Sequence, residues 1–179
     1  MKIETERLLL RPYAPEDADE QFRITSDPEF RRHMGPQFRP TRDKVLVGIG
    51  RFTEHWYQFG YGAWALELKG EGRLVGYCGM RHLLPSDEVE LFYGCDRDYW
   101  GRGLVTEAAR ASLRYGFGRM GFARVMAVTD KANLGSRRVM EKCGLRYERD
   151  TVYFDLPVVY YAVNRGDYRP DGSPYTERE

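Results

Sequence analysis

The chain has 179 residues, 42% of them apolar, and its 28 basic and 27 acidic residues leave a formal net charge of +1. This length and apolar content suit one domain with a single substantial core. The balanced charge argues against a nucleic-acid partner, and the lack of a long apolar run argues against a membrane span. The first residues are too charged for a secretory signal, so we expect a cytoplasmic protein.

The first half of the chain predicts a strand, two helices and a meander. The strand covers residues 4–11, and a helix over 15–26 begins with a proline and acidic residues in its first turn. A second helix over 41–59 has Thr41 as its cap and glycines at 48 and 50 that weaken it. Its apolar stripe is Leu46, Ile49, Phe52, Trp56 and Phe59.

Strands and helices alternate through the second half. Strands near 62–69, 73–82 and 88–95 form the meander, and a helix near 103–119 follows. Its apolar face is Leu104, Ala108, Ala111 and Tyr115. A strand at 123–129, a helix at 134–143 and two final strands complete the chain. The fold class is therefore α/β or α+β, with helices on both faces of a mixed sheet in a single domain over 1–168 and a flexible tail at 169–179.

Cysteine and histidine are scattered through the chain. The cysteines are odd in number and lie in apolar runs, which favours reduced core thiols over disulfides or metal ligands. We therefore expect no metal site. The residues concerned are Cys78, Cys95, Cys143, His33, His55 and His82.

The junction at residues 99–109 is the most informative segment. Gly101 and Gly103 lie between a strand-like run and a long helix without proline. The first-turn amides of a helix have no partner within the helix, and glycine lets an anion approach them. Three or four charge-assisted hydrogen bonds of about 1.5–3 kcal/mol each could hold a pyrophosphate. The alternative is a tight turn that binds nothing, because Thr106 breaks the dinucleotide fingerprint and no P-loop ending is present.

A second segment, residues 133–145, predicts a capped helix. Asn133 suits the N-cap and Gly144 suits the left-handed position after the last turn. Leu134, Val139, Met140 and Cys143 form its apolar stripe. Nothing in this pattern alone requires catalysis.

Together and in this order, the two segments resemble the GNAT superfamily of N-acetyltransferases, which move an acetyl group from acetyl-CoA to an amine. Residues 88–95 resemble the family's central bulged strand, and 61–80 resemble the hairpin before it. Residues 5–12 and 158–163 resemble the branch that acetylates ribosomal-protein N-termini. The similarity covers about residues 3–168 and implies a mixed, mostly antiparallel sheet.

The resemblance implies how acetyl-CoA would be bound. Backbone amides at 101–105 would hold the pyrophosphate, although Trp100 and Val105 depart from the usual ends of that loop. The pantetheine arm would lie beside residues 92–95, where an amide at the bulge would act as an oxyanion hole. The cofactor-binding residues are then Phe92, Tyr93, Gly94, Cys95, Gly101, Arg102, Gly103, Leu104, Val105, Asn133 and Ser136.

The same resemblance suggests catalytic residues. Glu90 would accept a proton from the amine, with a solvated surface carboxylate as the alternative and Glu88 on the same strand face. Ser136 would protonate the departing thiolate, with Tyr147 and Tyr153 as competing donors.

Three flanking side chains are assigned with their alternatives. Cys95 is expected to serve packing rather than to act as a nucleophile. Arg137 and Arg138 would meet the 3′-phosphate of CoA or remain solvated.

The function predicted is acetyl transfer to a protein N-terminus or a small-molecule amine in a ternary complex, by a monomer or homodimer. A noncatalytic CoA-binding regulator is one alternative. An interaction domain without a nucleotide is the other.

Overall fold

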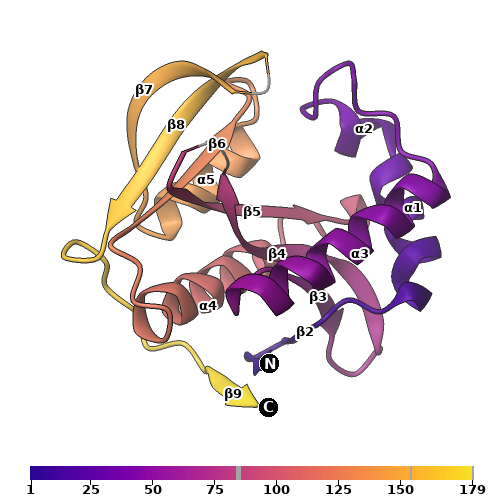
Figure 1. Ribbon diagram of the computed structural model, residues 1–179, viewed down its shortest axis with the longest axis horizontal. Helices are drawn as coiled ribbons and strands as arrows, with labels where there is room; N and C mark the ends of the chain where they lie inside the picture. The colour runs from indigo at the N-terminus through magenta and orange to yellow at the C-terminus, as the bar shows by residue number, and fades with distance from the viewer. Residues whose placement is uncertain (84–85, 154, 179) are drawn as a thin grey trace.

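The computed structural model describes residues 1–83, 86–153 and 155–178. Within these ranges the strands form one nine-stranded sheet in the order β7-β8-β6-β5-β4-β3-β2-β1-β9. Figure 1 shows the β7–β8 hairpin and α5 at one end of the molecule and α1 to α3 at the other. The predicted mixed, mostly antiparallel sheet is confirmed, because β5 and β6 are the one parallel pair among the described strands.

The element bounds follow in chain order. The strands are β1 Lys2–Glu4, β2 Leu8–Arg11, β3 Ala63–Leu68, β4 Arg73–Leu83, β5 Glu88–Cys95, β6 Arg124–Thr129, β7 Arg146–Tyr153, β8 Leu156–Asn164 and β9 Thr176–Arg178. The α-helices are α1 Ala18–Ser26, α2 Pro28–Arg31, α3 Arg42–Phe59, α4 Leu104–Gly118 and α5 Leu134–Lys142, and the 3-10 helices are η1 Pro15–Asp17 and η2 Arg97–Tyr99.

The side chains of the central strands point alternately into two buried cores, one on each face of the sheet. In β3, Trp64 and Leu66 join the buried cluster that contains α4 residues, whereas Ala63 and Ala65 join the cluster that contains Ile24 of α1. Successive side chains of a strand point to opposite faces, so a strand that is apolar throughout must be covered on both. The helices therefore lie on both faces, as the sequence predicts.

The long helices begin and end as the sequence predicts. Thr41 caps α3 by accepting a hydrogen bond from the Lys44 amide at 3.2 Å, and Gly60 ends the helix in the left-handed conformation. The apolar stripe of α3 differs from the predicted one at its first residue, because the Leu46 side chain is 37% exposed. Val45 packs against the core instead. In α4 the four predicted face residues are all buried.

Short elements depart from the prediction. The strand expected over 4–11 is a hairpin of β1 and β2, because the Thr5 amide donates to the Leu8 carbonyl, the Leu8 amide donates to the Thr5 hydroxyl oxygen, and the chain turns between them. Helix α2 was not expected. It forms because the Asp27 carboxylate accepts hydrogen bonds from the amides of Glu29 and Phe30.

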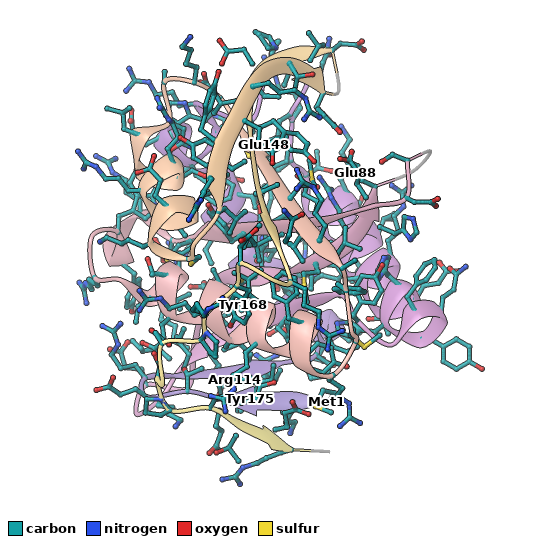
Figure 2. All side chains as sticks on the ribbon, turned by 90° about the vertical axis from the view of Figure 1, so that its left-hand side faces the viewer. Met1, Glu88, Arg114, Glu148, Tyr168 and Tyr175 are labelled. Atoms are coloured by element: carbon teal, nitrogen blue, oxygen red, sulfur yellow. The ribbon has the colours of Figure 1, made fainter. Side chains whose placement is uncertain are left out.

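The flexible tail predicted at 169–179 is wrong for the residues that form β9, which pairs with β1 at Lys2↔Arg178, Ile3↔Glu177 and Glu4↔Thr176. Figure 2 shows Arg114 and Tyr175 next to each other, with the guanidinium carbon 4.5 Å from the ring centroid. β9 covers the otherwise open edge of β1, and this pairing orders a polar segment that has no apolar pattern of its own.

A membrane-crossing helix would need a long apolar stretch, and none of the helices in the described ranges has one. The three cysteines are free thiols and are buried.

We expect Gly50→Ala to raise the free energy of unfolding by about 0.5–1 kcal/mol, because Gly50 is in an exposed helix interior with nothing near its missing Cβ. Gly79→Ala is the opposing control. Its Cβ would lie 2.1 Å from the Gly62 carbonyl oxygen, so it should destabilise by about 1–3 kcal/mol. Chemical denaturation of both variants checks this, and equal effects would contradict it.

Candidate active site

β5 and β6 separate just where the candidate site begins. They share the one pair Glu90↔Met126, although β5 continues to Cys95 and β6 to Thr129. No pair beyond Glu90 joins β5 to β6, so the ladder provides no partner on this edge for the main-chain groups of residues 92–95. Such an edge can hydrogen bond with an extended ligand as an added strand would.

The bulge predicted in residues 88–95 is wrong for the ladder with β4. That ladder runs from Gly76↔Cys95 to Leu83↔Glu88 without a register shift. The irregularity of β5 lies on its other edge, where pairing with β6 stops. An oxyanion-binding amide would therefore come from this unpaired edge rather than from a bulge.

Helix α2 spans the separation between the two strands. A Cβ on Gly94 of β5 would lie 2.8 Å from the Phe30 ring, so the ring packs closely over that glycine. On the other side, His33 Nδ1 lies 2.7 Å from a carboxylate oxygen of Asp130, directly after β6. Helix α2 thus contacts β5, and the residues directly after α2 contact the residue that follows β6.

Glu90 is a buried carboxylate next to the point of separation. It is 3% exposed, and its Oε2 accepts a hydrogen bond from Arg81 Nε at 2.5 Å. The Arg81 guanidinium also lies 4.9 Å from the centroid of the Phe92 ring. Burial raises the pKa of Glu90 above its ordinary value, and the charge and hydrogen bond of Arg81 oppose that rise. A carboxylate with a raised pKa is a stronger base.

Glu88 has a different environment two residues earlier. Tyr160 donates to its Oε1 and Tyr153 to its Oε2, both at 2.5 Å. Burial acts to raise the pKa of Glu88, but the hydrogen bonds from Tyr153 and Tyr160 outweigh it and lower the pKa. Glu88 is therefore held as an anion, and it is the weaker base of the two.

The glycine junction forms an uncapped helix start. Gly101 and Gly103 have φ values of 75° and 78°. Gly103 is the N-cap of α4 and provides no side-chain cap. The Glu107 amide donates to the Gly103 carbonyl at 3.0 Å, so the amides of residues 104–106 precede the first helical hydrogen bond. Within the described part of the chain, no side chain accepts from these three amides.

The side chains around this helix start leave its amides accessible. Leu104 is buried, and Val105 packs against the core. The Arg102 guanidinium lies 4.8 Å from the Tyr99 ring centroid and donates to the Asp98 carbonyl. No Cβ would meet an atom within 4 Å at Gly101. The residues present therefore fit a diphosphate bound by main-chain amides.

Ser136 and Tyr93 connect α5 to β5. The two hydroxyl oxygens are 3.0 Å apart, and the Tyr93 hydroxyl also donates to the Ser136 carbonyl at 3.0 Å. Burial raises the pKa of Tyr93 strongly, so this hydroxyl keeps its proton. Asn133 caps α5 as predicted, because its Oδ1 accepts from the Ser136 amide at 3.0 Å.

Tyr147 is not brought together with Glu90 or Ser136. It is 51% exposed, and its hydroxyl donates to Asp150 at 2.9 Å. It lines a separate cavity of about 540 Å³ that also includes Arg110 of α4 and Cys143. Its assignment as a proton donor stays a prediction without geometric support.

The other candidates fall into two groups. Burial raises the pKa of Cys95 to about 12, which argues for a packing role rather than a thiolate nucleophile. Arg137 donates to the Tyr161 hydroxyl at 3.1 Å, and Arg138 is exposed.

Among the described residues, no group of three or more His, Cys, Asp or Glu side chains is arranged to hold a metal ion.

One residue and two contacts of this region could not be read directly from the predicted elements. Arg81 lies opposite Glu90 in the β4–β5 ladder, and continuing the hairpin register from its short connection would have found it. The contact of Tyr93 with Ser136 joins residues 43 positions apart. His33 reaches Asp130 across 97 positions. No local pattern signals these last two contacts.

Comparison with known proteins identifies the family. A family model described as an acetyltransferase (GNAT) domain matches residues 7–146. The uncharacterized protein YkkB of Bacillus subtilis (strain 168) is 30% identical over 163 residues, covering 89% of this chain and 94% of that protein. The uncharacterized N-acetyltransferase YoaA of the same organism is 26% identical over 147 residues, covering 82% and 83%.

A solved structure has the same architecture. The GNAT family acetyltransferase from Bacillus anthracis aligns with a TM-score of 0.79 and 27% identity, covering 93% of this chain and 99% of that one. The chain belongs to the GNAT acetyltransferase family, and it is an N-acetyltransferase.

Proposed function

We propose that the protein transfers the acetyl group of acetyl-CoA to a primary amine by direct attack in a ternary complex. The observation that carries this proposal is the continuity of three features: the uncapped start of α4, the unpaired edge of β5 and the buried carboxylate Glu90. Acetyl-CoA, which the family uses, supplies the reactive thioester. Each part of it finds suitable groups along this path.

The main chain supplies most of the contacts for the donor. The amides of residues 104–106 would bind the diphosphate, and the edge of residues 91–95 would hydrogen bond with the amide groups of the pantetheine arm. Asn133 Nδ2 makes no hydrogen bond within the described residues, so it is available to the same arm. One β5 amide on this edge would stabilise negative charge on the thioester oxygen.

Two side chains would move the protons. An amine is mostly protonated near neutral pH, and Glu90 would accept that proton directly or through one water, leaving a nitrogen lone pair to form the new C–N bond. As the C–S bond breaks, the Ser136 hydroxyl would donate a proton to the sulfur. Water would return a proton to Ser136 and would receive the second proton that the nitrogen loses as the amide forms, while the Tyr93 hydroxyl, 3.0 Å away, keeps its own proton and holds Ser136 in place.

The acceptor is either a protein N-terminus or a small-molecule amine. Glu88 and Glu90 lie on the same face of β5, and both are suited to a cationic amine. Ionised Glu88 would attract the ammonium group, and Glu90 would take its proton.

Gly103→Val should weaken CoA binding by about tenfold, the loss of roughly one charge-assisted hydrogen bond, because the added side chain crowds the amides that follow. Gly121→Val is the matched control. Gly121 also has a left-handed φ, 70° against 78°, and lies just beyond the other end of α4. Calorimetric titration with CoA should give wild-type affinity for this control. If the wild-type protein binds no CoA at millimolar concentration, the proposed function fails.

Glu90→Gln should lower the rate of acetyl transfer by about 10²–10⁴ and leave CoA affinity unchanged. In the wild-type protein the rate should rise with pH as Glu90 loses its proton. Because burial raises the pKa of Glu90, this rise should lie above about pH 4.3, the ordinary glutamate value. Thiol release measured across a panel of primary amines gives the profile.

Glu88→Gln is the control for that profile. This variant removes a carboxylate from the same strand face. The rise of the rate with pH should stay where it is in the wild-type protein, since Glu88 is already ionised in that pH range. A profile that loses its acid limb in Glu88→Gln and retains it in Glu90→Gln would reverse the assignment. CoA binding without turnover on any amine would support a noncatalytic regulator instead.

A further inference from the structure

Arg7 joins the N-terminal hairpin to the glycine junction 95 residues later. Its Nη1 donates to the Arg102 carbonyl at 2.8 Å. Its Nε donates to Glu107 Oε2 at 2.7 Å, and its backbone amide donates to Glu107 Oε1 at 2.8 Å. One residue of the β1–β2 turn therefore binds both the loop before α4 and the first turn of the helix.

Glu107 needs this contact because of where it lies. Its side chain is 10% exposed, and the Thr5 hydroxyl also donates to its Oε1 at 2.6 Å. Burial acts to raise the pKa of Glu107, but the hydrogen bonds from Thr5 and Arg7 outweigh it and lower the pKa. The chain thus keeps an ionised carboxylate one residue beyond the three unpaired amides, where it would repel a bound anion.

The remaining face of the guanidinium points to the N-cap. A Cβ on Gly103 would lie 3.6 Å from Arg7 Nη2, and the Arg7 side chain is 44% exposed. Arg7 therefore lies against the helix start as well as beneath its loop. It forms an ion pair with Glu107 and holds the Arg102 carbonyl by a hydrogen bond.

We propose that Arg7 is a positioning residue of the diphosphate-binding site. It fixes the conformation of residues 101–103 and cancels the charge of Glu107, so that the amides of residues 104–106 present a net positive potential to the diphosphate of CoA. This inference rests on the proposed function, because it concerns the same donor site. It assigns a binding role to a residue outside the glycine junction.

Calorimetric titration with CoA and with 3′-dephospho-CoA tests the role of Arg7. Arg7→Ala should lower the affinity for both ligands by about tenfold, because both carry the diphosphate. Adding Glu107→Gln to Arg7→Ala should recover part of that loss, since the unpaired carboxylate is removed. Arg119→Ala is the matched control, because Arg119 forms a comparable ion pair with Glu177, at 3.2 Å, near the other end of α4. It should bind both ligands as the wild-type protein does.

Three results would overturn the inference while leaving the proposed function intact. Arg7→Ala could bind CoA within twofold of wild type, it could lose affinity for CoA alone and so act on the 3′-phosphate, or the double variant could recover nothing. Thermal unfolding is measured in parallel. If Arg7→Ala does not fold, Arg7→Lys answers the same question. Lysine keeps the charge but cannot bridge Arg102 and Glu107 together. Arg7→Lys should therefore lower the affinity for both ligands equally. Absence of CoA binding in the wild-type protein would instead refute the proposed function.

Discussion

A parallel ladder that stops after one pair, Glu90 with Met126, sets the layout of the site. Beyond Glu90 this edge of β5 has no further pair in β6, and of its main-chain groups the Cys95 carbonyl accepts a hydrogen bond from Trp100 Nε1 at 2.8 Å. An unsatisfied buried main-chain group costs about 1–3 kcal/mol, so the edge favours any extended molecule with amides of its own. The pantetheine arm has that chemistry. In the proposed function, binding of the donor would therefore follow from a missing strand pair rather than from particular side chains.

The surroundings of two carboxylates shift their pKa values in opposite directions, although the sequence alone gives no reason to distinguish them. Glu88 and Glu90 share a strand and a face, but tyrosine hydroxyls stabilise the charge of Glu88 while burial disfavours the charge of Glu90. Environments that push two acids apart in pKa also divide their roles. The less hydrated acid is suited to exchanging a proton, and the other to holding a fixed charge. Arg81 limits the rise at Glu90, since its guanidinium stabilises the ionised form.

The predictable parts of the fold are those whose local signals agree. Helices α3 and α5 carry a side-chain cap, an apolar period and a terminal glycine, and each begins at its predicted cap. The meander follows from alternation. By contrast, β1, α2 and β9 have only three or four residues, too few for a periodic pattern. β9 depends on its partner β1 at the other end of the chain and could not be predicted locally, whereas α2 has a local cap, Asp27, that the short pattern did not reveal.

The same distinction applies within the site. Glu90, Gly101 and Gly103 are recognisable because each belongs to a strand or helix start that the sequence already defines. Arg7 is not recognisable, because its partners Arg102 and Glu107 are about one hundred residues away. The bulge expected in β5 is absent from its ladder with β4 for a related reason: pairing on one edge of a strand gives no information about the other edge. Long-range pairings are properties of the packed chain, not of its segments.

The width of the gap between β5 and β6 is consequently set by side chains. One ladder position cannot fix how far two strands separate beyond it, and the contacts that continue across the gap come from elsewhere. On one face, Phe30 of α2 contacts Gly94 of β5, and His33, two residues after that helix, contacts Asp130 directly after β6. On the other, Tyr93 holds α5 through Ser136. Hydrogen bonds of this kind contribute about 0.5–1.5 kcal/mol each, far less than a strand ladder. The two halves of the sheet can therefore adjust to a bound donor at small cost, while the core on either side stays packed.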